Sequence, residues 1–155
     1  MLIRRAELSD AEAACDVLRR SIAELCGDDH RGVAATLAAW LANKTPDNVR
    51  RWIGHQHVFV AEEYGAILGV AALAPTGEVT LNYVSPDARF RGASKALMAR
   101  LEDQARVLGH TTLRLTSTAT ARRFYAACGY ADAGPPVVGY GTLQGYPMAK
   151  PLAGA

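Results

Sequence analysis

Residues 84–97 read VSPDARFRGASKAL, and this stretch is the most informative part of the chain. A β-rich segment ends at Val84, a turn follows, and a helix is expected from about Gly92 to Leu108. Backbone N–H groups at the start of a helix have no partner within the helix, and the helix dipole adds to their attraction for anions. The turn therefore predicts a site for a phosphate or a pyrophosphate.

The side chains of this turn suit such a ligand. Gly92 lets a ligand approach the backbone closely, and Ser94 adds a hydroxyl donor. Positive charge comes from Arg89, Arg91 and Lys95. The stretch matches neither the P-loop pattern GxxxxGK[ST] nor the Rossmann pattern GxGxxG. On the residues alone, a helix start with solvated basic side chains remains the alternative.

The segments around the turn predict one α+β domain over residues 1–155. Before the turn, three β-rich segments are expected to pair as adjacent antiparallel strands: 57–62, 66–73 and 78–84. The N-terminal part predicts a strand and then three helices: 2–6, 9–26, 32–42 and 45–54. After helix 92–108 we expect a strand, a helix and two short strands: 111–116, 119–128 and a pair within 130–152.

Two motifs in the expected order resemble a known family. The turn follows the pattern V-x-P-x-x-(Q/R)-x-x-G-x-(G/A), except that serine takes the last place: Val84, Pro86, Arg89, Gly92 and Ser94. Phe90 stands where glycine is frequent. A later block follows N-x-x-A-x-x-x-Y-x-x-x-G-F with Thr in place of Asn and Tyr in place of Phe: Thr118, Ala121, Tyr125, Gly129 and Tyr130. With the order of elements, these motifs make the chain similar to the GNAT acetyltransferase superfamily.

The resemblance implies a fold, a co-substrate and a reaction. The fold would be a mixed, mostly antiparallel sheet flanked by helices and splayed at its central strands to hold the coenzyme. Acetyl-CoA would be the co-substrate, and its acetyl group would pass to a primary amine by direct attack in a ternary complex. A non-catalytic acyl-CoA sensor and a nucleotide-binding regulator are the alternatives. The coenzyme contacts implied are Tyr83, Val84, Ser85, Arg89, Arg91, Gly92, Ala93, Ser94, Lys95 and Thr118.

The catalytic residues expected are Tyr125 and Glu78. Tyr125 occupies the family's tyrosine position and would protonate the departing thiolate, because a phenol with a pKa near 10 keeps its proton at neutral pH. Glu78 and Asn82 lie four residues apart on one expected strand, so they should share a face. Glu78 could then take the proton of the amine, and Asn82 could position a water or the substrate. A solvated acid after a turn is the alternative for Glu78.

The acceptor site is expected near the polar segment between the first two helices. In the family that this chain resembles, the corresponding loop borders the acceptor. Asp28 and Asp29 could hold an ammonium group, and His30, with a pKa near 6.5, could act as a base. A solvated loop is the alternative. No His/Cys spacing matches a metal site, so no metal is predicted.

Composition limits the remaining classes of function. A formal net charge of +2 without a long basic run argues against a nucleic-acid binder. No apolar run is long enough for a membrane span, and no signal peptide is expected. Cys15, Cys26 and Cys128 form no CxxC pair, which favours packed thiols and a cytoplasmic location. The Gly/Pro-rich tail, 134–151, is expected to close the acceptor side or to form a homodimer through its strands.

Overall fold

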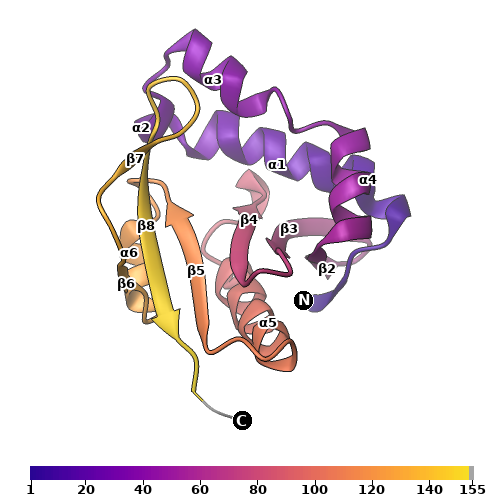
Figure 1. The fold of residues 1–155 in the computed structure, drawn as a ribbon. Helices are drawn as coiled ribbons and strands as arrows, with labels where there is room; N and C mark the ends of the chain where they lie inside the picture. The colour runs from indigo at the N-terminus through magenta and orange to yellow at the C-terminus, as the bar shows by residue number, and fades with distance from the viewer. Residues whose placement is uncertain (154–155) are drawn as a thin grey trace.

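The computed structural model describes residues 1–153 and shows helices packed on both faces of an open sheet (Figure 1). The strand order is β1-β2-β3-β4-β5-β8-β6, and β7 pairs with β8. The strands are β1 Leu2–Arg5, β2 His57–Glu63, β3 Ala66–Leu73, β4 Glu78–Val84, β5 Thr112–Ser117, β6 Ala131–Asp132, β7 Val137–Val138 and β8 Gln144–Pro151. The helices are α1 Ala11–Leu25, α2 Gly27–His30, α3 Ala34–Leu41, α4 Pro46–His55, α5 Ala93–Val107 and α6 Arg122–Ala127, with 3-10 turns at Leu8–Asp10 and Pro86–Ala88.

Alternation along the central strands builds two apolar cores, one on each face of the sheet. Val58 and Val60 point to one face, where they pack with α1 residues such as Leu18. Phe59 and Ala61 point to the other face, where they pack with α5 residues such as Leu101. The predicted antiparallel strands 66–73 and 78–84 are confirmed to the residue, because this alternation and the turns that bound it are local signals.

The sheet is split between β4 and β5, as the resemblance implied (Figure 1). These two parallel strands pair only where Glu78 lies opposite Arg114 and Val79 opposite Leu115. Beyond those pairs β4 stays with β3, while β5 stays with β8 along its full length from Thr112 to Ser117. The α+β fold with a mostly antiparallel, splayed sheet is therefore confirmed.

A β-bulge interrupts β4 and overturns one expectation. Val79 pairs with Leu73 and Leu81 with Ala72, so Thr80 is an extra residue on β4. Val79 consequently packs in the core beneath α5, whereas Leu81, two residues later, packs beneath α1. The prediction that Glu78 and Asn82 share a face is wrong, because the bulge reverses the alternation between them.

The N-terminal half differs from expectation around residue 30. The break expected at 27–29 is instead the short helix α2, and Arg31 and Gly32 end it with positive φ angles of 53° and 67°. Helix α3 therefore begins two residues later than expected, at Ala34. Thr45 caps the start of α4, since its hydroxyl accepts a hydrogen bond from the Asn48 N–H at 3.2 Å.

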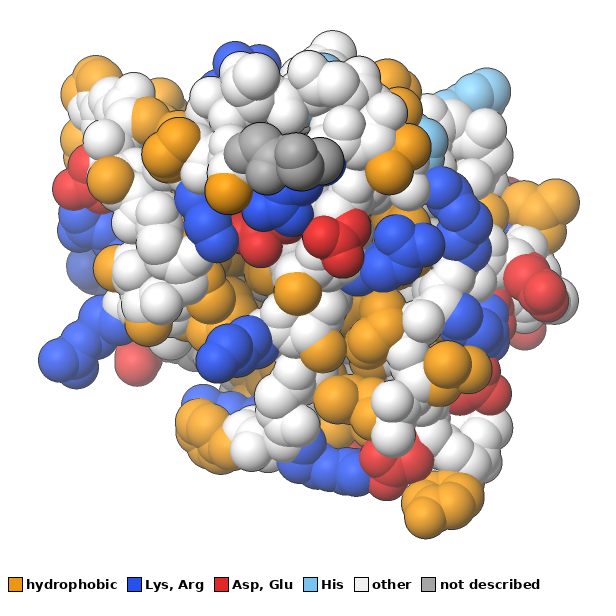
Figure 2. Space-filling view, turned by 90° about the horizontal axis from the view of Figure 1, so that it is seen from below, with side chains coloured by type: hydrophobic (Ala, Val, Ile, Leu, Met, Phe, Trp, Pro, Cys, Tyr) orange, Lys and Arg blue, Asp and Glu red, His pale blue; other side chains and the backbone are white. Residues whose placement is uncertain are grey.

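The surface and the chain ends complete the description. On the face seen in Figure 2, basic side chains lie among acidic and hydrophobic ones. No helix within residues 1–153 is both long and apolar enough to cross a membrane. The prediction of a single domain over 1–155 stays a prediction, and its last two residues lie outside the described range.

Candidate active site

A cavity of about 310 Å³ occupies the split between β4 and β5. Its walls come from α1, from the C-terminal part of β4, from the turn before α5, and from the segment that links β5 to α6. The lining residues are Ser21, Leu25, Cys26, Asn82, Tyr83, Val84, Arg89, Phe90, Ser94, Thr116, Ser117, Thr118, Thr120, Ala121, Phe124 and Tyr125. The cavity thus brings together both sequence motifs and one face of α1.

A second cavity of about 420 Å³ lies over the turn itself. It is lined by Val84, Ala88, Arg89, Phe90, Gly92, Ala93, Ser94, Lys95 and Phe124. Val84, Arg89, Phe90, Ser94 and Phe124 line both cavities, so the two form one groove from the split sheet to the start of α5.

The start of α5 is open to a ligand. Gly92 is the N-cap residue, with a φ of 81°, and it supplies no side chain to cap the first turn. A Cβ at Gly92 would meet nothing within 4 Å. The backbone N–H groups of the first turn therefore keep their capacity for an anion, as the sequence predicted for this turn. Phe90 also has a positive φ, 62°, and its ring is 92% exposed at the mouth of the groove.

The basic side chains of the turn divide into two groups. Arg89 and Lys95 line the groove. Arg91 instead points to β2, where its guanidinium pairs with the carboxylate of Glu63 and lowers the pKa of that carboxyl. Arg91 lines neither cavity of the groove, so the structure brings only Arg89 and Lys95 to the predicted anion site.

The free edge of β4 offers the backbone of Asn82 and Val84. The Ser85 N–H bonds to the Leu68 carbonyl at 2.7 Å, on the β3 side of the strand. Because backbone groups alternate along a strand, Tyr83 also faces β3, and Asn82 and Val84 face the split. Of the stretch 83–85 expected to meet the coenzyme through its backbone, only Val84 turns its N–H toward the groove. The Ser85 hydroxyl caps the next turn by accepting from the Asp87 N–H at 3.2 Å.

Tyr125 and Asn82 meet across the cavity, although they lie on α6 and β4. The Asn82 side-chain N–H₂ donates to the Tyr125 hydroxyl at 3.0 Å, so that hydroxyl keeps its own proton for another acceptor. Burial raises the pKa of Tyr125 to about 12. The Asn82 Oδ1 atom is buried and has no hydrogen-bond partner among residues 1–153. This pair therefore presents one free donor proton and one free acceptor to a ligand.

The remaining predicted catalytic residue, Glu78, does not join this pair. It is exposed at the start of β4, where the two strands are still paired, and it does not line the groove. No Asp, Glu or His from the described part of the chain lines the cavity that holds Tyr125. The cavity provides a proton donor and no carboxylate or imidazole base.

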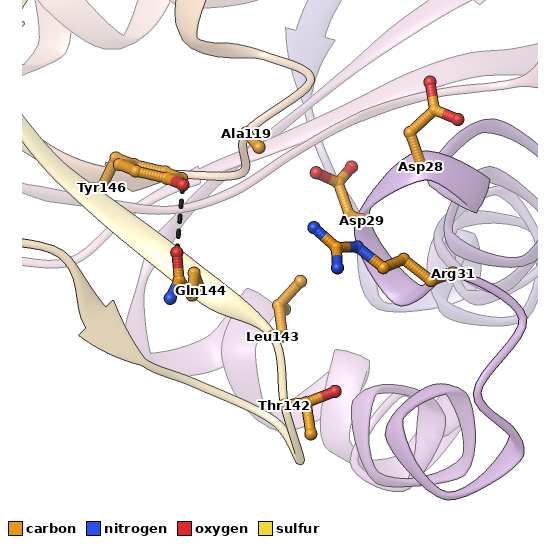
Figure 3. A pocket seen from close by; sticks show the side chains of 8 residues that line it. All are labelled: Asp28, Asp29, Arg31, Ala119, Thr142, Leu143, Gln144 and Tyr146. Carbon is orange, nitrogen blue, oxygen red and sulfur yellow. Dashed lines mark hydrogen bonds between the residues drawn. The ribbon is translucent and has the colours of Figure 1, made fainter.

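Asp28, Asp29 and Arg31 line a smaller cavity of about 180 Å³ beside the groove, drawn in Figure 3. Asp29 lies where this cavity meets the groove, and its carboxylate accepts from the Thr120 N–H at 3.1 Å and from the Thr120 hydroxyl at 2.5 Å. Asp28 lines the smaller cavity, and His30 is buried nearby on α2 without lining it. The His30 Nδ1 atom accepts from the Gly32 N–H at 3.1 Å.

The groove has lining residues that the motifs did not predict, Ser21, Leu25 and Cys26, beside the predicted coenzyme contacts Tyr83 and Thr118. Ser21 and Leu25 line it from α1, and their i, i+4 spacing is the only sequence sign that they share a face. Tyr83 contacts Trp40, whose indole N–H donates to the Tyr83 hydroxyl at 3.2 Å. Cys26 is a packed thiol, because burial raises its pKa to about 12. The Thr118 hydroxyl accepts from the Ala121 N–H at 3.2 Å and so stabilises the turn that leads into α6.

The side chains that commonly bind metal ions are not grouped together in the described residues. Across residues 1–153, no group of three or more His, Cys, Asp or Glu side chains is placed to hold a metal ion. Cys15, Cys26 and Cys128 are all free thiols.

The acetyltransferase (GNAT) domain profile matches residues 26–152 of this chain. Two curated relatives match shorter stretches. An IAA acetyltransferase from Azospirillum brasilense is 36% identical over 84 residues, which are 49% of this chain and 55% of that protein. An amino-acid acetyltransferase from Pseudomonas syringae pv. syringae is 39% identical over 70 residues, which are 42% of this chain and 16% of that protein. The chain thus spans at most about half the length of these relatives in each match.

Solved structures match over nearly the whole chain. A GCN5-related N-acetyltransferase from Rhodopseudomonas palustris superposes with a TM-score of 0.88 and 25% identity, covering 97% of this chain and 95% of that one. The PaiA N-acetyltransferase from Thermoplasma acidophilum, solved in complex with coenzyme A, gives a TM-score of 0.79 at 17% identity, covering 97% and 98%. At 17% identity, the comparison with PaiA shows a shared fold alone.

Proposed function

Because this chain belongs to the GNAT acetyltransferase family, we propose that it transfers the acetyl group of acetyl-CoA to a primary amine in a ternary complex. One observation carries the proposal: the hydroxyl of Tyr125, held by Asn82, faces a groove that continues to an uncapped helix N-terminus. A thioester in the split would have a proton donor beside it and an anion site at the far end. The coenzyme A bound to PaiA supports the choice of co-substrate.

Each part of acetyl-CoA has a matching part of the groove. The pyrophosphate would lie on the first turn of α5, near Gly92 and Ser94, with Arg89 and Lys95 supplying charge. The pantetheine arm would lie along the free edge of β4 and pair with the backbone of Val84 and Asn82. Such pairing would complete the sheet where β4 and β5 separate.

The transfer then follows from the residues around the split. The amine nitrogen attacks the carbonyl carbon, so that a C–N bond forms and the C–S bond breaks. Tyr125 gives its hydroxyl proton to the departing sulfur, the adduct's protonated nitrogen loses its proton to water, and water returns a proton to Tyr125. The unpartnered Oδ1 of Asn82 would accept an N–H of the incoming amine and aim its lone pair. Water is the base in this proposal, because the cavity supplies no acidic or imidazole side chain.

The test is a turnover assay combined with a binding assay. Acetyl-CoA should raise the melting temperature, since a ligand at about 100 times its Kd stabilises a fold by about 2.7 kcal/mol. A panel of primary amines should yield N-acetyl product and free thiol in equal amounts. A thermal shift without any product would instead support the acyl-CoA sensor, and no shift at millimolar coenzyme would count against both.

Two further expectations accompany the proposal. The three free cysteines suit a reducing compartment, so we expect a cytoplasmic location. A homodimer through the C-terminal strands would use β7, where Val137 and Val138 are exposed, whereas Met148 is buried in the protein's own core. Sedimentation across a range of concentrations would test the dimer.

A further inference from the structure

The cavity drawn in Figure 3 is lined by a positively charged side chain, Arg31, that contributes no ion pair to the described part of the fold. Arg31 lines it, and within residues 1–153 its guanidinium makes no hydrogen bond or ion pair. Arg31 also lies in the left-handed region with a φ of 53°, a conformation that residues other than glycine adopt infrequently. Its N–H ends α2 by bonding to the Gly27 carbonyl at 2.8 Å, a contact that any residue would make. The side chain is therefore free to serve a ligand.

Beside Arg31 and the two carboxylates of Asp28 and Asp29, the cavity offers a further free donor. Figure 3 shows the guanidinium extending toward the middle of the cavity, while the Asp28 carboxylate points outward. The carboxylate of Asp29 is occupied by the Thr120 N–H and hydroxyl. The Tyr146 hydroxyl donates to the Gln144 Oε1 atom at 3.2 Å, which leaves the Gln144 amide N–H₂ as a further donor.

The cavity also lies next to the reaction centre. Ala119 lines it, while Thr118, Thr120 and Ala121 line the groove that holds Tyr125. The same short segment thus forms a wall of both cavities. A molecule with its amine beside Asn82 and Tyr125 could place its other end beside Arg31.

From this juxtaposition we infer that the acceptor is an amine that also bears a carboxylate, and that Arg31 binds the carboxylate through a forked, charge-assisted hydrogen bond. The inference rests on the proposed acetyl transfer and names its substrate class. The two cavities adjoin along the segment 118–121, so an acceptor that reaches both carries its carboxylate several bonds from its amine. Arg31 and the Gln144 amide bind one end, and Asn82 positions the other.

A matched series of substrates tests this. The wild-type protein with acetyl-CoA is given ω-amino acids of increasing chain length, the alkylamines of equal length and the corresponding diamines. We expect kcat/KM for the acids to exceed that for the alkylamines by about tenfold at one preferred length, the usual scale for a charge-assisted pair at a partly exposed site. Equal rates for acids and alkylamines at every length would overturn the inference, as would a preference for diamines, which would assign the cavity to Asp28.

Variants separate a binding role from a general loss of charge. Arg31→Gln should lower the ratio of acid to alkylamine kcat/KM by about tenfold, chiefly through the KM of the acid. Arg31→Lys keeps the charge without the fork and should restore part of the ratio. Arg51→Gln on α4, outside the cavity, removes the same charge and should leave the ratio unchanged. A ratio that Arg31→Gln does not change would refute the role of Arg31.

Failure of the proposed function gives a different result. If the protein acetylates other primary amines but neither series, acetyl transfer stands and the carboxylate inference falls. If no amine of any kind is acetylated, both fall together.

Discussion

The proposed coenzyme side of the groove and the proposed acceptor side, the cavity next to it, are built in different ways. The coenzyme side comes from two continuous stretches, the turn from Val84 to Lys95 and the segment from Thr118 to Tyr125. The acceptor side is assembled from three stretches that lie far apart in the sequence: Asp28, Asp29 and Arg31; Ala119; and Thr142, Leu143, Gln144 and Tyr146. Local patterns can therefore predict the first side, whereas the second exists only once distant segments have docked.

The docking of the acceptor side depends on a loop between β7 and β8. Tyr140 stacks on Trp40, with ring centroids 6.4 Å apart, and its hydroxyl accepts from the buried Lys44 ammonium at 3.3 Å. Burial lowers the pKa of Lys44. The Thr142 N–H donates to the Thr36 hydroxyl at 3.2 Å. These contacts hold Thr142 and Gln144 against the cavity without touching the coenzyme turn, so the two sides should respond separately to substitution.

The largest effect is expected at the point where the two sides meet. Tyr125→Phe keeps the ring and removes the proton donor, so kcat should fall by about 100-fold while the KM for acetyl-CoA stays near wild type. Single-turnover rates at saturating substrates measure the chemical step. Tyr130→Phe is the matched control, because Tyr130 is buried in the same core but lines a different cavity. An unchanged chemical step in Tyr125→Phe would make Tyr125 a packing residue.

A charge placed on the coenzyme side should affect that side alone. Gly92→Asp puts a carboxylate at the first turn of α5, and we expect coenzyme A to bind roughly tenfold more weakly in calorimetry. Gly92→Asn is the control, since Asn has the same shape and a similar tolerance of positive φ without the charge. Equal affinities in the two variants would show that no phosphate lies near Gly92.

The reverse experiment disturbs the acceptor side. A Cβ at Gly141, whose φ is 55°, would lie 2.6 Å from the Thr36 hydroxyl oxygen and 3.0 Å from its Cα. Gly141→Ala should therefore shift the loop and raise the acceptor KM several-fold, a loss of about 1 kcal/mol, with little change in coenzyme affinity. Gly139→Ala meets only ordinary contacts at 3.7 Å and 3.9 Å and should behave as wild type. A parallel loss of coenzyme affinity in Gly141→Ala would contradict the independence of the two sides.

The smallest effect is expected in the pH dependence of kcat/KM, which distinguishes the proton given by Tyr125 from the proton lost by the amine. Tyr125 acts in its protonated form, and burial raises its pKa to about 12, so no descending limb should appear between pH 8 and pH 10. With water as the base, the ascending limb of kcat/KM should follow the pKa of the acceptor amine and move when a less basic amine is used. A limb fixed in position for all amines would reveal a protein base.

The strand–turn–helix geometry at 84–97 could be predicted because its signals are short-range. A strand end, a glycine and an unpaired helix start are all readable within 84–97. Two expectations failed for reasons beyond that range. Glu78 and Asn82 do not share a face, because the sequence of β4 does not indicate the bulge at Thr80. Arg91 does not reach the anion site, because it pairs with Glu63 on β2. The Asp28 segment was located, but its partners at 142–146 and the role of Arg31 depend on the tertiary fold. The catalytic and binding roles themselves stay predictions.

The separation of β4 from β5 also fixes how backbone amides exchange with solvent deuterium. In the coenzyme-free protein the amides of Asn82 and Val84 face the split, while that of Ser85 is bonded to Leu68 and that of Tyr83 faces β3. Exchange should consequently alternate between fast and slow at single-residue spacing along a strand in the middle of a sheet. Binding of acetyl-CoA should then slow the exchange of the Asn82 and Val84 amides as well, which mass spectrometry with residue resolution would detect.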